Sequence, residues 1–486
     1  MAALVLLGVL TLAALWYPVR RISQREDINY NEGWNAYRAQ AVVHGDALYS
    51  APPAFTVTNY PPLSFHLLAF FGKFLGGYTA AGRWLSLASL AFLSLLIAML
   101  VRQYAGRWSL GIYAALLFAL GMAVFAPNRV AMDDPQFFGL AWSFAGLYIY
   151  VKNPRSYRIL GASAAAFAIS LFIKHNLLAF PAAVGIHLLL ERAWKHFSLW
   201  LGAAAAISAA LLALTFWRDG PYFFLHLLSP RSYSLLSLAG RTLPYLIEFQ
   251  IPFAVAVFWC VRYAGWPMRR LLVIAFLLAN LFGVGFSGGY GVDENILFDA
   301  VITIVAITAI GIGDLEPKLM SLQFGNLLLF LALTIPCLAV AAPLPELLRD
   351  GLNSSREQAK LDGEFGQAVE FLESRPGPAL CEDLLLCYQA GKPPLYDAFY
   401  ANSQLKTGRV SEAELRDYIQ VSRFPTVEIT IPSTQPLAPA AMLRFSEPVL
   451  RAILERYRPA LRTSEFTLLI PKEKIPKEES GQKVAR

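Results

Sequence analysis

Carboxylates and basic side chains gather in the polar connections that separate long apolar runs of this sequence. Asp27 and Glu32 follow the first apolar run in an aromatic stretch, Asp134 stands just before a later run, and Lys174 follows another. Ionisable residues that collect at the ends of apolar helices on one membrane face often form a functional site. These residues therefore point to chemistry at a boundary between lipid and water.

The composition identifies the elements that must position these groups as membrane helices. Of 486 residues, 56% are hydrophobic and 15% are charged, and the mean hydropathy is +0.47. Soluble domains carry about 25% charged residues, so this composition is typical of an integral membrane protein. The net charge of +7 is spread over the loops. It needs no nucleic-acid partner, and it adds weak attraction to anionic lipid headgroups.

Eleven apolar stretches predict transmembrane helices, since a bilayer core of ~30 Å needs about 20 apolar residues. The first stretch lacks a basic start and a cleavage site, so we expect it to be a retained helix and not a signal peptide. The predicted helices are 2–17, 83–101, 109–126, 137–151, 159–173, 177–190, 198–217, 244–261, 271–286, 296–312 and 320–341.

Basic residues in alternate loops predict the orientation of these helices. The positive-inside rule places those loops in the cytoplasm, which puts the N-terminus inside and the C-terminal region outside. Arg20, Arg21 and Arg25 are an exception on the outer side, which hints at a bound anion there. The apolar stretch 62–76 is too short to cross comfortably and is predicted to lie in the outer interface.

The last 140 residues have the pattern of an extracytoplasmic α/β domain. We predict a membrane domain over 1–342, an α/β domain over 343–471 and a disordered tail over 472–486. Ser411 and Glu414 form a capping-box pattern at a helix start. Cys381 and Cys387 either pair across a turn or point to different faces of a helix, and an oxidising compartment permits the bond.

Several candidate residues also have a purely structural interpretation. Asp134 followed by Pro135 is a good helix start, whereas its neighbour Asp133 has no evident structural role. Lys174 can extend its ammonium group to the interface, and Asp293 with Glu294 can form a solvated turn. Glu32 is the hardest to explain structurally.

The order of motifs resembles the GT-C superfamily of membrane glycosyltransferases, in particular the protein O-mannosyltransferases and the lipid A aminoarabinose transferases. The likeness covers the first 200 residues and extends to later helices only in topology. The family's acidic pair is Asp-Glu, but here it is Asn31-Glu32. Its Lys-Pro-Pro-Leu motif is here Tyr60 to Leu63, so one expected phosphate contact is missing. The other matches are Gly82-Arg83 at the start of a span, Asp133 or Asp134 in an external loop, and Lys174 followed by Pro181.

This resemblance implies an enzyme of the bacterial inner membrane that transfers a sugar from a polyprenyl-phosphate carrier. The acceptor is an external hydroxyl on a glycan, a lipid or a protein, and the reaction inverts the anomeric carbon. Glu32 or Asp27 is the expected base, and Asp134 with Asp133 orients the acceptor or a divalent cation. The expected contacts to donor and phosphate are Lys174, Arg83, Arg218, Tyr60 and His175.

Two functions from other classes compete with this interpretation. A multi-pass transporter usually shows inverted repeats and charges at the bilayer midplane, whereas the centres of the helices predicted here carry no charge. The other competitor is a non-catalytic component of cell-envelope glycan assembly. A phospholipid-headgroup phosphotransferase would need a nucleophile cluster of His or Thr, which the external loops lack.

Overall fold

The structure is a computed structural model that describes residues 1–51, 55–422, 424–430 and 444–472. The chain divides into two compact units. The helical unit consists of Met1–Ser23, Arg38–Ser50 and Thr58–Arg356. The C-terminal unit consists of Gln24–Tyr37, Ala51–Val57 and Glu357–Arg486. The predicted tail lies outside the described residues, apart from Lys472.

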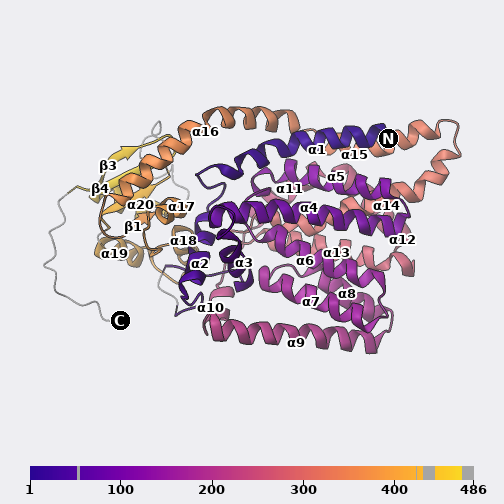
Figure 1. The fold of residues 1–486 in the computed structure, drawn as a ribbon, viewed down its shortest axis with the longest axis horizontal. Helices are drawn as coiled ribbons and strands as arrows, with labels where there is room; N and C mark the ends of the chain where they lie inside the picture. The colour runs from indigo at the N-terminus through magenta and orange to yellow at the C-terminus, as the bar shows by residue number, and fades with distance from the viewer. Residues whose placement is uncertain (52–54, 423, 431–443, 473–486) are drawn as a thin grey trace. The chain divides into compact units, whose positions relative to one another are not determined.

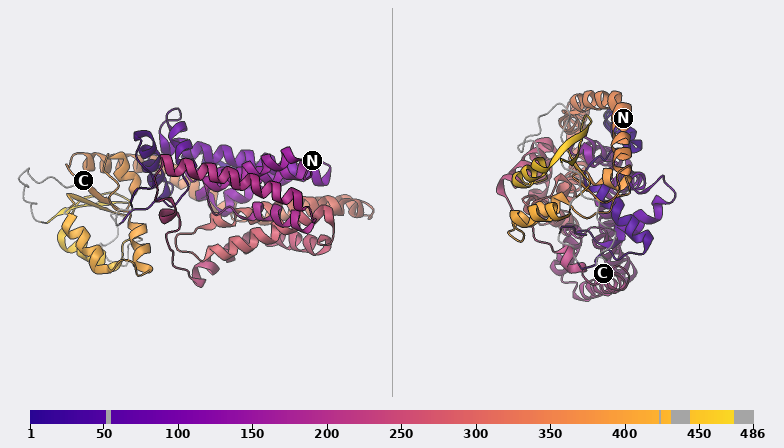
Figure 2. Two further views of the ribbon diagram at one scale, coloured as in Figure 1. Left: turned by 90° about the horizontal axis from the view of Figure 1, so that it is seen from below. Right: turned by 90° about the vertical axis from the view of Figure 1, so that its left-hand side faces the viewer.

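The helical unit is built from long apolar helices that run side by side along a common direction (Figures 1 and 2). Two helices cross the division between the units, namely α2 (Asn31–His44) and α16 (Leu344–Glu373). The other helices of this unit are α1 (Ala2–Arg20), α3 (Pro62–Gly72), α4 (Tyr78–Ala105), α5 (Trp108–Phe125), α6 (Gln136–Lys152), α7 (Tyr157–Ile173), α8 (Ala179–Leu190), α9 (Trp194–Arg218), α10 (Phe223–Leu227), α11 (Leu235–Glu248), α12 (Gln250–Tyr263), α13 (Pro267–Ser287), α14 (Phe298–Met320) and α15 (Gly325–Val340).

Helix α14 forms the centre of this unit. In the apolar span Glu294–Met320, which contains it, 94% of the residues in the 18-residue apolar stretch are buried, and α14 packs against α4, α5, α12, α13 and α15. In α9 only 11% of the residues in such a stretch are buried, and α9 packs against α7 and α8 at one edge. An apolar helix with so little burial has a surface that suits lipid and not water.

Every predicted transmembrane stretch coincides with a helix or a pair of helices, so the predicted fold class is confirmed. One stretch differs in shape. The expected single helix 244–261 is α11 and α12, which meet at Phe249 with a bend of 85°. Pro252 lies in the first turn of α12, where its missing N–H is tolerated and a continuous helix would have lost a hydrogen bond.

The number of membrane crossings stays a prediction. Within the described part of the chain, six helices are long and apolar enough to cross, or up to eight if each bent pair counts as one span. Helix α3 has 11 residues, which at 1.5 Å per residue reach about 16 Å and cannot span ~30 Å of hydrocarbon. Its length agrees with the interfacial placement that we predict.

The C-terminal unit contains a four-stranded sheet of order β1-β2-β4-β3, in which only β1 and β2 are parallel. The capping box is confirmed: the Glu414 carboxylate accepts from the Ser411 amide at 2.7 Å, and Ser411 Oγ accepts from the Glu414 amide. A disulfide joins Cys381 and Cys387. The elements are β1 (Ala379–Cys381), α17 (Leu384–Gln389), α18 (Ala398–Lys406), α19 (Glu412–Ser422), β2 (Thr426–Ile429), α20 (Glu447–Arg456), β3 (Tyr457–Arg462) and β4 (Thr467–Pro471).

Glu26 is buried in this unit among other acids. The side chain is 7% exposed. Burial, with Glu465, Asp362, Asp383 and Glu364 nearby, raises its pKa to about 8. The folded protein therefore keeps a proton on Glu26 at a pH where the unfolded chain has lost it.

We expect Glu26→Gln to remove part of the pH dependence of thermal stability. Because the folded pKa lies above the usual 4.5, stabilisation by Glu26 is complete below pH 4.5 and is lost as the pH rises to 8. The variant should therefore melt like the wild type at pH 4.5 and a few degrees higher at pH 8.5. The exposed Glu370 provides the control, and a parallel shift in Glu370→Gln would contradict the assignment.

Alkaline phosphatase fusions test the predicted orientation, because that reporter folds only in an oxidising compartment. The fusion after Gly265, between α12 and α13, should be inactive, since Arg262, Arg269 and Arg270 place that loop inside. The fusion after Lys472 should be active. The reverse pattern would invert the predicted topology.

Candidate active site

Asp134 is the centre of a buried group of charged side chains in the helical unit. One carboxylate oxygen, Oδ1, accepts from the Lys174 ammonium at 2.8 Å and from the amide of Gln136, the first residue of α6, at 2.7 Å. The other, Oδ2, accepts from Asn295 at 3.3 Å. Asp134 therefore stands one position before the N-cap Pro135, accepts from the first amide of α6, and also pairs with a cation.

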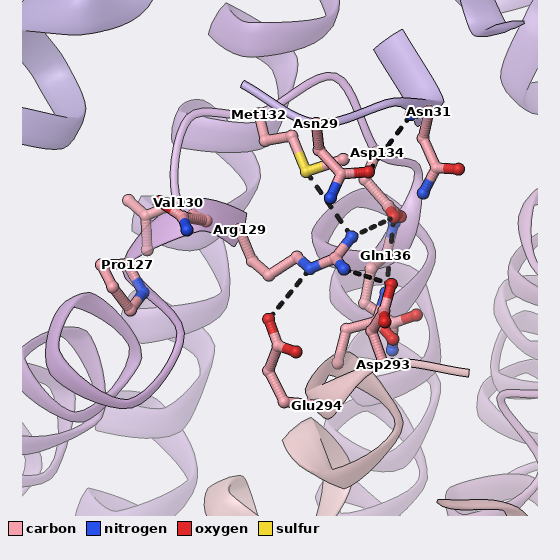
Figure 3. Close-up of polar contacts among 12 residues, drawn as sticks. Asn29, Asn31, Pro127, Arg129, Val130, Met132, Asp134, Gln136, Asp293 and Glu294 are labelled. Carbon is pink, nitrogen blue, oxygen red and sulfur yellow. Dashed lines mark hydrogen bonds and ion pairs between the residues drawn. The ribbon is translucent and has the colours of Figure 1, made fainter. Parts of the chain in front are cut away.

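Arg129 is the second cation of this group. It follows α5 in the short helix η2 (Pro127–Arg129) and is 4% exposed. Its Nη1 lies 3.6 Å from Asp134 Oδ2, its Nε donates to Glu294 at 3.0 Å, and its Nη2 donates to Asp293 (Figure 3). Asp293 and Glu294 pair with a buried guanidinium, but their side chains are 40% and 33% exposed, so a partly solvated turn still describes them.

Two cations thus meet three carboxylates, of which Asp134 is buried and Asp293 and Glu294 are partly exposed. Burial raises the pKa of Asp134, but the charges of Lys174 and Arg129 and the hydrogen bonds from Lys174 and Gln136 outweigh burial, so the net pKa is lowered. Burial lowers the pKa of Lys174, and Asp134 opposes that change. We infer that Asp134 is ionised, and its charge in turn favours the ammonium form of Lys174.

The backbone that carries Asp134 is strained. Ala131, between Arg129 and Asp134, has φ +55°, in the left-handed region that costs an alanine on the order of 1 kcal/mol. The residue is fully buried. Such conformations persist where the surroundings determine them, and they occur often at functional sites.

Tyr60 stands at the face of Lys174. The Lys174 ammonium lies 4.9 Å from the centre of the Tyr60 ring, within the range of a cation–π contact. Tyr60 stands where the Lys-Pro-Pro-Leu motif has its lysine. At this position the protein therefore has an aromatic ring that contacts the Lys174 cation, and not a second cation. Burial raises the pKa of the Tyr60 hydroxyl, so it stays protonated at neutral pH.

His175 is next to this group and is uncharged. Burial, with Arg231 and Lys174 nearby, lowers its pKa to about 4. Among the residues that the structure describes, no group of three or more His, Cys, Asp or Glu side chains is arranged to hold a metal ion. A divalent cation at this site stays a prediction.

The remaining candidates of the helical unit lie elsewhere or act structurally. Asp133 packs so closely on α4 that a Cβ on Gly82 would lie 2.1 Å from its carboxyl carbon. Arg83 is buried and donates to the Ile22 carbonyl at 3.1 Å. Arg218 donates to the Val42 carbonyl at 3.4 Å. For these three residues, a role in binding donor or acceptor stays a prediction.

Of the basic residues after α1, where we inferred a bound anion, Arg21 needs no anion as a partner. Arg21 is 5% exposed, and its guanidinium donates to the carbonyls of Pro127 and Val130 and to Asn128. This arginine holds the loop that carries Arg129.

Glu32 and Asp27 belong to the C-terminal unit, together with the rest of Gln24–Tyr37. Glu32 is in the first turn of α2, is fully buried, and accepts from the Ile28 amide at 2.8 Å. Asp27 is half-buried. The two expected bases thus belong to one unit and the Asp134–Lys174 pair to the other, and their shared pocket stays a prediction.

Arg129 and Asn295 were not among the residues selected from the sequence. Arg129 follows Pro127 and Asn128 in a short connection, where an arginine usually reports topology. With the predicted orientation, Arg129 lies on the outer side, where the positive-inside rule expects few arginines, and that exception could have singled it out.

Solved structures show which fold this is. ArnT from Cupriavidus metallidurans bound to undecaprenyl phosphate aligns with a TM-score of 0.63 and 13% identity, over 95% of this chain and 97% of that chain. The oligosaccharyltransferase AglB from Archaeoglobus fulgidus, in complex with an inhibitory peptide and a dolichol-phosphate, aligns with a TM-score of 0.54 and 12% identity, over 98% and 75%. The chain therefore has the GT-C fold, as its motif order predicted.

A scan of protein-family models and a search of curated proteins both find no match to this sequence. At the identities above, the likeness establishes the fold and leaves the activity to be argued from the site.

We expect Arg129→Met to destabilise the folded protein by ~3–5 kcal/mol, because it removes one of the two cations beside the buried Asp134. The control is Arg107→Met, which removes an ion pair to Glu316 from an arginine that is 55% exposed and should cost less than ~1 kcal/mol. Thermal unfolding in detergent measures both. Equal losses would show that burial does not strengthen the Arg129 network.

Proposed function

We propose that this protein transfers a sugar from a polyprenyl-phosphate carrier to an extracytoplasmic hydroxyl, with inversion at the anomeric carbon. The observation that carries the proposal is the buried Lys174–Asp134–Arg129 group at the ends of apolar helices in a GT-C fold. A lipid-linked donor also accounts for helices that are apolar on nearly all sides. Besides the lipid-linked donor, the protein would bind an acceptor, whose hydroxyl belongs to a glycan, a lipid or a protein.

Lys174 is the group that we propose for the departing phosphate. Its ammonium is fixed by Asp134 at 2.8 Å and by the Tyr60 ring, so little reorganisation is needed when negative charge develops nearby. Fixed positive charge in a site with little water stabilises a developing oxyanion more strongly than the same charge in water. Arg129 neutralises the acids around Asp134 and so keeps the surroundings of Lys174 from becoming strongly negative.

Glu32 is the carboxylate that we propose as base, with Asp27 as the alternative. The base takes the proton of the acceptor hydroxyl while that oxygen attacks the anomeric carbon. The bond from this carbon to the phosphate oxygen breaks on the opposite face, and its electron pair leaves with the phosphate. Inversion follows because the forming and breaking bonds lie on opposite faces of the sugar.

The proposed location is the bacterial inner membrane, with the C-terminal unit on the extracytoplasmic side. The basic loops support this orientation, and the disulfide between Cys381 and Cys387 fits an oxidising compartment. A transporter has less support, because the paired charges described above lie in loops and at helix ends and not in helix centres.

The direct test is to incubate purified full-length protein with a panel of radiolabelled undecaprenyl-phosphate pentoses and hexoses and to measure which one is consumed. We expect consumption of one class, with release of undecaprenyl phosphate in equal amount. Consumption of none, with protein that is folded and monodisperse, would favour the non-catalytic role in glycan assembly.

With the donor known, Glu32→Gln and Asp27→Asn identify the base. Loss of a positioned base lowers the rate by roughly 10²–10⁴-fold, and we expect that loss for Glu32→Gln if Glu32 is the base. The exposed Glu412 supplies the matched control Glu412→Gln, which should transfer at the wild-type rate. Full activity in both Glu32→Gln and Asp27→Asn would remove both residues from the mechanism.

A further inference from the structure

The segment that carries Glu32 is held by the C-terminal domain, although more than 300 residues separate them in sequence. The Arg25 amide donates to Asp362 at 2.8 Å, and the Gln389 side chain donates to the Arg25 carbonyl at 3.1 Å. Contacts at Tyr30, Gly33 and Tyr37 follow. The whole segment Gln24–Tyr37 accordingly groups with that domain and not with the helices on either side of it in sequence.

The firmest of these contacts joins Tyr30 to Asp397. The Tyr30 hydroxyl donates to Asp397 Oδ1, and both side chains are more than nine-tenths buried. The same oxygen accepts from the Tyr400 amide at 2.9 Å, so the carboxylate also caps α18. The Arg444 guanidinium covers the Tyr30 ring at 4.3 Å. Asp397 is thus a fixed acceptor, and Tyr30 has little freedom around it.

The second contact lies immediately after Glu32. A Cβ on Gly33 would be 2.1 Å from the Leu385 nitrogen, so the first turn of α2 meets the backbone of α17 with no room for a side chain. The start of α17 is itself fixed, because Asp383 accepts from the amides of Leu385 and Leu386. The disulfide of Cys387 adds a covalent link from α17 to the end of β1.

A third contact lies at the end of the segment. The Tyr37 hydroxyl donates to the Lys392 carbonyl at 2.7 Å, and the Tyr37 ring meets Tyr388 edge-on at 5.2 Å. Lys392 is held in turn, because its ammonium donates to the Arg375 carbonyl at 2.6 Å and to the Gly377 carbonyl at 3.3 Å. Lys392 therefore links the end of the segment Gln24–Tyr37 to the connection between α16 and β1.

Glu32 sits between these contacts, two residues after Tyr30 and one before Gly33. Its own carboxylate accepts from the Ile28 amide, which folds the segment back on itself. A carboxylate held from both sides in this way has few positions open to it. A catalytic group must be held within about 0.5 Å of its working position, and an error of 1 Å can reduce the rate about 10²-fold.

We propose that Tyr30 and Asp397 are positioning residues for Glu32, so that the C-terminal domain sets the geometry of the base. The proposal rests on the function given above. It gives the C-terminal domain a part in the chemical step.

A double-mutant cycle with the full-length protein tests this, using the labelled undecaprenyl-phosphate sugar that the panel identifies. We expect Tyr30→Phe to lower kcat about 10–100-fold and to change the donor KM less than about twofold, since only the base moves. In the Glu32→Gln background, the same substitution should change nothing further, because there is no base left to misplace. A Tyr30→Phe effect of unchanged size in that background would overturn the proposal.

The matched control is Tyr457→Phe. Tyr457 is also a buried tyrosine of the C-terminal unit, and its hydroxyl donates to the Phe424 carbonyl at 3.0 Å. Loss of the Tyr457 hydroxyl should leave kcat unchanged. Asp397→Asn keeps an oxygen for both Tyr30 and Tyr400 and should retain most of kcat, whereas Asp397→Ala should fall as far as Tyr30→Phe. An equal loss in Tyr457→Phe would mean that general loosening of the domain is the cause, and the proposal would fall.

Hydrogen exchange separates failure of this proposal from failure of the proposed function. The amides of residues 27–34 should exchange at least about tenfold faster in Tyr30→Phe than in the wild type or in Tyr457→Phe, whether or not a sugar is transferred. Unchanged exchange would overturn the positioning role alone. A wild type that consumes no polyprenyl-phosphate sugar, with faster exchange in Tyr30→Phe, would overturn the transferase and leave the anchoring of the segment intact.

Discussion

The requirement that a buried charge be paired shapes the helical unit around Asp134. Removing an ion from water costs several kcal/mol even after relaxation, and only close partners recover that cost. Asp134 has Lys174 from the end of α7, Arg129 from the end of α5, and Asn295 from the connection before α14. Three segments far apart in sequence must therefore converge, and Ala131 adopts a left-handed backbone between Arg129 and Asp134. The same pairing leaves a lysine ammonium fixed and poorly hydrated, which is the state in which it stabilises a departing phosphate well.

The second constraint is that the proposed base and the proposed phosphate contact belong to different units of the fold. Glu32 lies in a segment that contacts the C-terminal domain through Tyr30, Gly33 and Tyr37. Helix α2 begins in that unit and ends in the helical unit, as α16 does in the opposite order. These two continuous helices connect the part that carries the base with the part that carries Lys174. A change that weakens the C-terminal domain is therefore expected to reach the chemical step even when the membrane helices are intact.

Elements with a strong local signal could be predicted from the sequence, and those set by distant contacts could not. The apolar runs, the capping box at Ser411 and the interfacial length of α3 depend on a few neighbouring residues. The strand β3 was missed because its pattern of exposed and apolar residues is irregular and its pairing with β4 joins residues five to fourteen positions apart. The bend at Phe249 was missed although Glu248 and Gln250 interrupt the apolar run there, because the residues beyond them are apolar. The residue Arg129 was overlooked because two of its partners, Asp293 and Glu294, lie more than 160 residues further along the chain.

By itself, the sequence determined that this is a membrane protein of many helices followed by a polar α/β region, because hydropathy and charge are sums over adjacent residues. It also determined the order of motifs that resembles the GT-C superfamily, and the positions of Asp134, Lys174 and Glu32 within them. Only the tertiary structure decided which charges pair, since a salt bridge depends on separation in space and not along the chain. It likewise decided that the stretch after α1 joins the C-terminal domain, because Tyr30 and Asp397 meet across 367 residues of sequence.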